Sequence, residues 1–209
     1  MANTARIRIL SIDNHPLFQE GIGAIVNCQP DMSLAGVASK GIEAIEIFRA
    51  LQPDVTLLDL RLPDLNGLDV MMVIRSEFPE ARIVILTTFE RDVEIQRALK
   101  AGARGYLLKS MPPQQMIESI RQVHAGRKSV PPEIATRLAE HIADEALSER
   151  EIEVLRNVAA GSRNRDIGEK LYIAEETVKA HLKHIITKLR AGDRTEAVAI
   201  AIRRGIIEL

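Results

Sequence analysis

The sequence predicts an α/β fold with a doubly wound, five-stranded parallel sheet, followed by a smaller all-α domain of four helices. Between residues 6 and 125, short apolar, β-branched runs alternate with helical patterns, as they do where helices join the strands of a parallel sheet. These runs are almost continuously apolar, which is typical of strands that are buried on both faces. From residue 126 onward the sequence offers helical patterns and no further strand candidate.

The strands are predicted from the apolar runs, and the helices from apolar residues spaced three and four apart, as in residues 41–51 and 68–77. The expected strands cover residues 7–12, 34–38, 55–58, 83–86 and 105–108.

A connector separates the two predicted domains. Residues 126–132 break the alternation of strands and helices, and Pro131 with Pro132 suits the start of a helix at about Glu133. A length of 209 residues is comfortable for two domains. We predict a first domain at residues 1–125, a connector with one helix at 126–146, and a second domain at 147–209.

The second domain begins with Ser148-x-x-Glu151, a spacing in which the hydroxyl and the carboxylate can bond each other's free backbone amides at a helix start. Further helical patterns cover Asn164–Leu171, Glu175–Leu189 and residues 195–204. Only three residues separate the first two of these helices, and such a short connection is typical of helix-turn-helix architecture.

Composition excludes several classes of protein. A net charge of −1 and a hydrophobic content of 46% are typical of a globular protein. The lone Cys28 forms no intramolecular disulfide, which indicates a reducing compartment. No run approaches the roughly 18 apolar residues of a membrane span, and the N-terminal residues lack the apolar core of a signal peptide. We therefore expect a cytoplasmic protein that does not contact the membrane.

Polar residues end four of the expected strands. Asp13-Asn14 follows the first strand, Asp59 the third, Thr87 the fourth and Lys109 the fifth. The carboxyl ends of parallel strands meet at one edge of the sheet, where α/β proteins place their chemistry. Each residue alone also fits a turn or a helix cap. Together they supply a nucleophile, a cation and the carboxylates that Mg²⁺ prefers.

These strand ends resemble the receiver domain of bacterial response regulators, with the motifs in the family's order and spacing over residues 5–125. The motifs are Asp13-Asn-His-Pro, Leu57-Leu-Asp-Leu-Arg-Leu-Pro-Asp-Leu-Asn-Gly67, Ile85-Leu-Thr-Thr88 and Gly102-Ala-Arg-Gly-Tyr-Leu-Leu-Lys109. The resemblance implies a flavodoxin-like sheet with strand order 2-1-3-4-5. It also implies a sensor histidine kinase as partner.

The resemblance implies a role for each residue of this edge. Asp59 is the phospho-acceptor, Lys109 pairs with the phosphoryl group, Thr87 hydrogen-bonds it, and Tyr106 is the switch residue that moves with Thr87. The implied Mg²⁺ ligands are Asp13, Asn14, Asp59 and the backbone carbonyl of Arg61. A carboxylate that attacks a phosphoryl donor forms an aspartyl phosphate, and the cations neutralise the charge on the transferring oxygens.

Asn14 departs from the family pattern, in which most members have a second acid at this position. An amide oxygen can coordinate Mg²⁺ but adds no negative charge. We therefore expect weaker metal binding, and phosphorylation that is slower or dispensable. The neighbouring His15 fits a loop residue before Pro16 better than a metal ligand.

The predicted helix Glu175–Leu189 carries an apolar stripe and a basic side. Lys179 and Lys183 lie one turn apart, off the apolar stripe. Between Lys179 and Arg204 there are seven basic and two acidic residues, and such a sorting of charge suggests a nucleic-acid face. The pattern alone slightly favours an amphipathic helix with a solvated lysine face.

The motifs of this half resemble the LuxR-type DNA-binding domain over residues 147–209, and the combination identifies the NarL/FixJ subfamily of response regulators. The matching segments are Leu147-Ser-Glu-Arg-Glu-Ile-Glu-Val-Leu155, Ala160-Gly161, Asn164-Arg-Asp-Ile-Gly, Thr177-Val-Lys-Ala-His-Leu, Lys188-Leu and Arg194-Thr-Glu-Ala-Val198. Ala174 departs from the Ser or Thr that usually precedes the recognition helix and caps it.

The resemblance implies that Glu175–Leu189 is the recognition helix of a homodimer on DNA. The residues expected to face DNA are Lys179, Ala180, Lys183, His184 and Thr187, with Lys188 and Arg190 placed for phosphates. The last helix is expected to form the dimer contact, with Ala197 and Ala201 allowing close approach.

The sequence therefore predicts a transcription factor, not an enzyme, that Mg²⁺-dependent phosphorylation of Asp59 switches between states of DNA binding. The alternative is a phosphorylation-independent DNA-binding regulator whose first domain serves only dimerisation or ligand sensing. A phosphatase that uses Asp59 would need a second carboxylate two residues on, where Arg61 stands.

Overall fold

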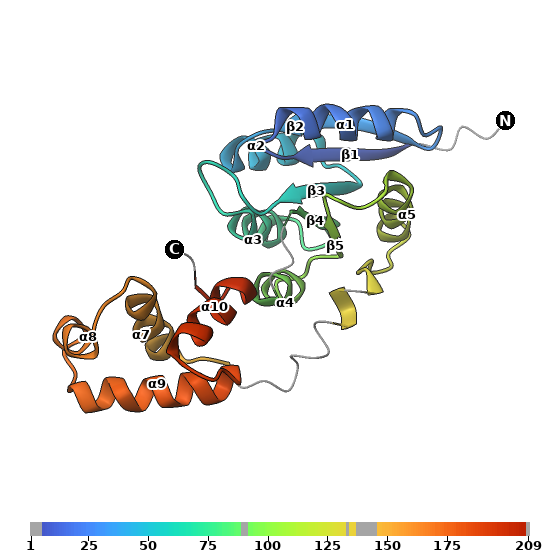
Figure 1. The fold of residues 1–209 in the computed structure, drawn as a ribbon. Helices are drawn as coiled ribbons and strands as arrows, with labels where there is room; N and C mark the ends of the chain where they lie inside the picture. Colours follow the sequence, from blue (N-terminus) through green and yellow to red (C-terminus); the bar gives the residue numbers. More distant parts are fainter. Residues whose placement is uncertain (1–5, 89–91, 133, 137–145, 208–209) are drawn as a thin grey trace. The chain divides into compact units, whose positions relative to one another are not determined.

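The computed structural model describes residues 6–88, 92–132, 134–136 and 146–207. The chain divides into two compact units (Figure 1), of which the first holds a five-stranded sheet and the second is helical. Within the described residues, no helix is both long and apolar enough to cross a membrane.

Strands and helices alternate along the first unit. The strands are β1 (Ile7–Ile12), β2 (Met32–Ala38), β3 (Val55–Asp59), β4 (Ile83–Thr87) and β5 (Gly105–Leu108). The helices are α1 (Pro16–Asn27), α2 (Gly41–Leu51), α3 (Gly67–Glu77), α4 (Asp92–Lys100) and α5 (Pro113–His124). The strands pair in parallel in the order β2-β1-β3-β4-β5, which confirms the predicted fold class and strand order.

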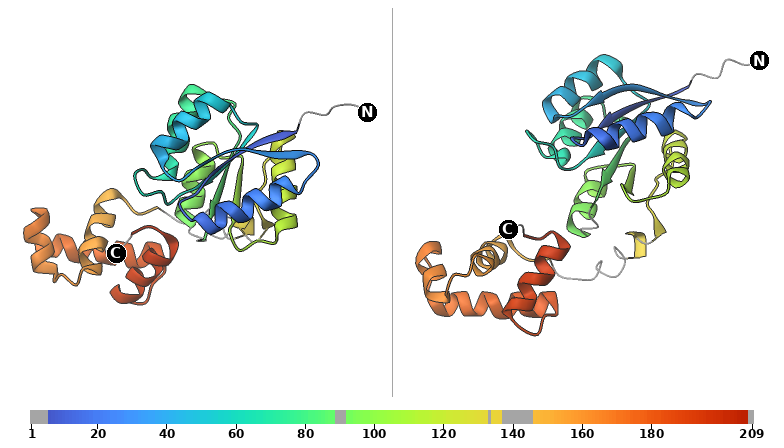
Figure 2. Two further views of the ribbon diagram at one scale, coloured as in Figure 1. Left: turned by 90° about the horizontal axis from the view of Figure 1, so that it is seen from above. Right: turned by 45° about the horizontal axis from the view of Figure 1, so that its top comes forward.

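The sheet is covered on both faces, with α1 and α5 on one side and α2, α3 and α4 on the other (Figure 2). Every residue of β3 and of β4 is buried, as their continuously apolar runs predicted. On one face, Ile9, Leu57 and Leu107 of the strands join Ile22 of α1 and Ile120 of α5 in a single apolar cluster. Strands that are largely or wholly buried therefore precede or carry the residues at the carboxyl edge.

β2 begins two residues earlier than the apolar pattern predicted. Met32 pairs with Ile7, and Ser33 with Arg8, so backbone hydrogen bonds to β1 extend the strand through a polar residue. β3 and β4 each run one residue beyond the predicted ends and include Asp59 and Thr87.

The connector attaches to the edge of the sheet. The Ser129 amide donates to the Arg104 carbonyl (2.9 Å), and the Tyr106 amide donates to the Ser129 carbonyl (3.0 Å), which forms a parallel bridge between Gly105 and Ser129. The pattern of the sequence gave no sign of this pairing. The predicted connector helix lies largely outside the described residues, of which Pro132 and residues 134–136 are helical.

The second unit contains α7 (Glu149–Ala159), α8 (Asn164–Leu171), α9 (Glu175–Leu189) and α10 (Arg194–Arg204), the four predicted helices. The capping box at the start of α7 is present, with the Glu151 amide 3.3 Å from the Ser148 hydroxyl and the Ser148 amide 2.7 Å from the Glu151 carboxylate. As expected, the Ala174 side chain offers α9 no cap. One apolar core joins the four helices, with Val154, Ile167, Val178 and Ile185 among its buried residues.

Candidate functional site

The carboxyl edge of the sheet brings three of the predicted side chains into contact. Lys109, directly after β5, places its Nζ 2.6 Å from Asp13 Oδ2 and 2.7 Å from Asp59 Oδ2. The side chains of Asp13, Asp59 and Lys109 are only 1%, 4% and 7% exposed. Thr87, at the end of the neighbouring β4, is buried too, and its carbonyl accepts the Lys109 amide (2.8 Å). The four strand ends converge as predicted.

The charges of this cluster do not balance. Two buried carboxylates share one ammonium group, which leaves a net negative charge in a place that water scarcely reaches. Although the Lys109 ammonium is near, Asp13 Oδ2 is buried without a hydrogen bond of good geometry. Oxygen donors with surplus negative charge form the kind of site that a hard divalent cation neutralises.

His15 belongs to the same cluster, which the sequence did not lead us to expect. Its Nδ1 lies 3.0 Å from Asp13 Oδ1, 3.9 Å from Asp59 Oδ2 and 3.4 Å from Lys109 Nζ. Asp13, His15 and Asp59 each offer a ligand atom within 4.8 Å of the others. The sequence feature that could have indicated this contact is the two-residue spacing between Asp13 and His15. The His15 amide donates to the Asp13 carboxylate (2.9 Å), which turns the imidazole toward it.

The loop after β3 is held tightly against the Asp59 backbone. The Arg61 amide donates to Asp59 Oδ1 (3.2 Å), and Arg61 forms a bridge with Asn66. A Cβ on Gly67 would lie 2.3 Å from the Asp59 carbonyl oxygen, so only glycine permits this approach of α3. Asn14, the remaining predicted metal ligand, is exposed beside the buried Asp13.

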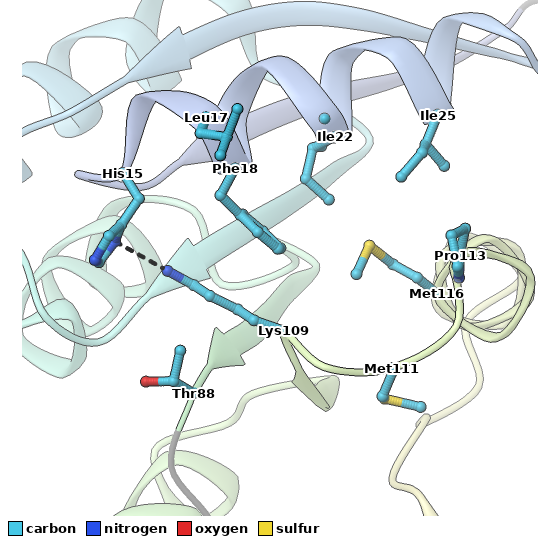
Figure 3. A pocket seen from close by; sticks show the side chains of 11 residues that line it. His15, Leu17, Phe18, Ile22, Ile25, Thr88, Lys109, Met111, Pro113 and Met116 are labelled. Atoms are coloured by element: carbon cyan, nitrogen blue, oxygen red, sulfur yellow. Dashed lines mark hydrogen bonds between the residues drawn. The ribbon is translucent and has the colours of Figure 1, made fainter.

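A pocket of about 490 Å³ opens next to the acidic cluster. Figure 3 shows His15 and Lys109 pointing toward each other at one end, with apolar side chains of α1 and of the β5–α5 region around the rest. The Lys109 ammonium lies 5.0 Å from the centre of the Phe18 ring, within reach of a cation–π interaction. Tyr106, the predicted switch residue, is completely buried in β5.

In the second unit, α9 separates an apolar side from a polar one. Its buried residues are Val178, Leu182, Ile185 and Leu189. The exposed residues that were predicted to face DNA are Lys179, Ala180, Lys183, His184, Thr187 and Arg190. The structure therefore gathers six of the seven predicted DNA-facing residues on the solvent side of α9 and its C-cap.

Lys188 does not fit the predicted contact with phosphate. Its side chain is 17% exposed, and its Nζ lies 3.0 Å from Glu151 Oε2 and 3.4 Å from the Ala146 carbonyl. Lys188 precedes the buried Leu189, so it lies at the margin of the apolar stripe and turns toward α7. The prediction is corrected: Lys188 is an internal ion-pair partner.

Glu151 is the residue that this ion pair stabilises. Burial raises the pKa of Glu151, but hydrogen bonds from the Ser148 amide and from Lys188 outweigh the effect of burial, so the pKa lies below its usual value. The capping-box motif predicted the bond to Ser148, whereas nothing in the sequence indicated the pairing with Lys188.

The dimerisation prediction for Ala197 and Ala201 is also corrected. Both are completely buried in the core of their own unit, where α10 packs against α7 and α9. Their small side chains allow the close approach of α10 to these helices and are not available to a partner.

Comparison with known proteins places both halves of the chain. Residues 9–121 match the family "Response regulator receiver domain", and residues 145–201 match "Bacterial regulatory proteins, luxR family". The chain is 38% identical over 218 residues to an uncharacterized transcriptional regulatory protein of Bacillus subtilis, YxjL, covering 99% of this chain and 100% of that protein.

Two further relatives are named as response regulators. The nitrate/nitrite response regulator protein NarL of Escherichia coli is 34% identical over 206 residues, covering 94% of this chain and 95% of NarL. The crystal structure of the response regulator ChrA of a heme-sensing two-component system is 33% identical, with a TM-score of 0.58 and coverage of 97% of this chain and 100% of ChrA. The chain therefore belongs to the two-component response regulators that join a receiver domain to a LuxR-type DNA-binding domain and regulate transcription.

Proposed function

We propose that phosphorylation of Asp59 switches this response regulator, and that the phosphorylated form binds a DNA operator as a homodimer. The observation that carries the proposal is the pair of buried carboxylates, Asp13 and Asp59, that share the ammonium of Lys109. The proposed boundaries are residues 1–125 for the receiver domain, 126–146 for the connector and 147–209 for the DNA-binding domain. The protein is proposed to act in the cytoplasm.

In the proposed reaction, a carboxylate oxygen of Asp59 attacks the phosphorus of a sensor histidine kinase's phosphohistidine or of a small phosphodonor. The new O–P bond forms as the bond to the donor breaks, and the donor leaves with that electron pair. Lys109 neutralises charge on the phosphoryl oxygens, and the Thr87 hydroxyl hydrogen-bonds one of them. Tyr106 then rearranges with Thr87.

The buried carboxylates of Asp13 and Asp59 suit Mg²⁺, and the Asn14 amide oxygen and the Arg61 carbonyl would be its other protein ligands. When bound, Mg²⁺ would balance the surplus negative charge of the carboxylates and that of the incoming phosphoryl group.

On the DNA side, we propose α9 as the recognition helix in the major groove. Lys179, Ala180, Lys183, His184 and Thr187 would face bases, and Arg190 would contact phosphate. The exposure of these residues and the basic character of the 179–204 segment support the assignment. Lys188 is left out of this interface because Glu151 holds it.

The alternative function, DNA binding that does not depend on phosphorylation, has two observations in its favour. Asn14 supplies an amide where a second carboxylate would strengthen metal binding. The apolar pocket beside Lys109 also offers a volume of about 490 Å³, within the range of small-molecule sites.

Intact-mass measurement distinguishes these two functions, because it shows whether Asp59 takes up a phosphate. After incubation of the full chain with acetyl phosphate and Mg²⁺, we expect one added phosphate, and none in Asp59→Asn. A phosphate that persists in Asp59→Asn would refute the assignment of the acceptor, whereas an unmodified wild-type chain would support the alternative.

The recognition helix is tested with Lys183→Ala. A base contact of this kind is worth about 1–3 kcal/mol of discrimination, so the variant should bind the operator more weakly while losing less affinity for random DNA. Equal losses on both DNAs would make Lys183 a phosphate contact, and no loss on either would exclude α9 from the interface.

A further inference from the structure

The first turn of α9 carries an exposed ion-pair network. Lys179 Nζ lies 2.8 Å from Glu176 Oε1 and 3.3 Å from Glu175 Oε1. The hydrogen bond to Glu176, followed by that to Glu175, raises the pKa of Lys179 above its ordinary value. Two carboxylates and one ammonium leave this turn with a net negative charge. This charge opposes the approach of DNA phosphates to the end of a helix that is proposed to enter a DNA groove.

Glu176 lies in line with three of the five residues proposed to face bases. Residues 176, 180, 183 and 187 follow each other at intervals of four, three and four, so they share one face of the helix. All four are exposed, and the Glu176 side chain is 81% exposed. Glu175 lies outside this line and is 46% exposed. The carboxylate of Glu176 would therefore enter the groove together with Lys183.

A carboxylate in this position distinguishes between DNA sequences. It repels the phosphate backbone of any duplex, and Lys179 must leave Glu176 before it can contact DNA, so binding to an arbitrary sequence is weakened. In the major groove, the N4 amino group of cytosine is the donor that a Glu or Asp side chain accepts. A hydrogen bond to a C·G pair at the matching position would offset the repulsion.

We propose that Glu176 is a specificity-determining residue that selects a C·G base pair in each half-site and lowers binding to other DNA. This inference rests on the proposed placement of α9 in the major groove.

The test is a selection of operators from random-sequence duplex DNA by the phosphorylated full chain, followed by binding isotherms over a series of salt concentrations. Wild-type protein should enrich cytosine at one position of each half-site. Glu176→Ala should lose the preference at that position alone, and Glu176→Gln should shift it toward adenine, which glutamine reads through N6 and N7.

The isotherms give a second readout. With the Glu176 carboxylate removed and Lys179 paired only with Glu175, Glu176→Ala should bind random DNA more tightly, and the slope of log affinity against log salt should steepen by about one ion. The ratio of operator to random-DNA affinity should fall about tenfold. The control is Glu169→Ala on α8, where Glu169 is exposed and also forms an ion pair within its own helix, at i,i+4 with Arg165 (3.0 Å). We expect that control to leave the selected sequence unchanged.

Two outcomes contradict the inference, and they are distinguishable from failure of the proposed function. If Lys183→Ala changes the selected sequence and Glu176→Ala does not, α9 is the recognition helix and Glu176 has no role in specificity. If neither variant changes the sequence or the affinity ratio, α9 does not read DNA and the proposed interface fails as well.

Discussion

At the scale of single residues, the acidic cluster is distinguished by one surplus negative charge. Asp13 and Asp59 are buried on neighbouring strands around one ammonium, and Asn14 stands beside them as a neutral amide. A second carboxylate there would add the negative charge that a divalent cation needs.

We therefore expect Asn14→Asp to bind Mg²⁺ more tightly than the wild type and to be phosphorylated faster. Titration calorimetry with Mg²⁺ measures the affinity, and phosphorylation by acetyl phosphate over time measures the rate. Tighter binding at an unchanged rate would mean that metal does not limit the reaction. An unchanged affinity would mean that the amide oxygen already serves as a full ligand.

The pair of Glu151 and Lys188 is the second residue-scale feature. Replacing Lys188 with Met removes the ammonium and leaves a carboxylate that is 5% exposed without its charged partner. The Ser148 amide still bonds the carboxylate, so the second unit should lose about 1.5–3 kcal/mol of stability, the typical contribution of a hydrogen bond between charged groups. Hydrogen exchange of the α7 and α9 amides measures this loss, with Lys183→Met as the exposed control on the same helix. If Lys188→Met proves as stable as Lys183→Met but binds DNA more weakly, Lys188 contacts phosphate after all.

The same pair predicts a dependence on pH. The pKa of Glu151 in the folded chain lies below its ordinary value of about 4.5, so its contribution to stability is complete above that pH. The contribution is lost as the pH falls through the lowered pKa. Protection of the α7 amides should therefore decline below pH 4.5, and Glu151→Gln should decline less. Parallel declines in the two proteins would show that other carboxylates govern the acid sensitivity.

Residue positions that depend on one strand or one loop were predictable from the sequence. Asp13, Asp59 and Lys109 each end a strand, and parallel strands bring their ends together. Lys188 and Ala197 were misjudged because their surroundings come from elsewhere in the chain. The Lys188 ammonium meets a carboxylate on α7. The His15 imidazole lies 3.0 Å from the Asp13 carboxylate, as their spacing could have indicated, and 3.9 Å from that of Asp59 on β3. Ala197 is covered by packing within its own unit. A pattern of spacing along one helix does not record which neighbour covers it.

At the scale of elements, backbone hydrogen bonds explain two features that hydropathy did not predict, the start of β2 and the pairing of the connector. Apolar runs predicted all five strands, but pairing with β1 extends β2 to Met32, and the polar connector joins β5 at Ser129. Gly105 makes the second pairing possible, because a Cβ there would lie 3.0 Å from the Ser129 carbonyl oxygen and 3.2 Å from Val84.

We expect Gly105→Ala to push the connector away from β5 and to destabilise the first unit by about 1–3 kcal/mol through overpacking. Hydrogen exchange should quicken at the amides of Tyr106 and Ser129, which form the bridge. Gly21→Ala is the matched control, because nothing lies within 4 Å of a Cβ at that position in α1. It should be neutral or stabilising by up to about 1 kcal/mol. Unchanged exchange at Ser129 in Gly105→Ala would show that the connector does not depend on this contact.

At the scale of the whole molecule, the chain separates chemistry from recognition. The first unit holds the acidic cluster on rigid strands, and the second presents α9 with its exposed basic residues. The β5 strand carries Tyr106, directly precedes Lys109 and pairs with the connector. Backbone hydrogen bonds therefore join the strand before Lys109 to the segment that leads to the DNA-binding domain.

The central claim is that phosphorylation of Asp59 controls DNA binding, and operator-binding isotherms test it most directly. Wild type and Asp59→Asn are each measured with and without acetyl phosphate and Mg²⁺, on an operator selected from random-sequence DNA. We predict that the phosphodonor tightens binding of the wild type severalfold or more and leaves Asp59→Asn at the affinity of the untreated wild type. The intact mass of the treated wild type confirms its phosphate. If all four affinities are nevertheless equal, the result contradicts this account and establishes a regulator that binds DNA independently of phosphorylation.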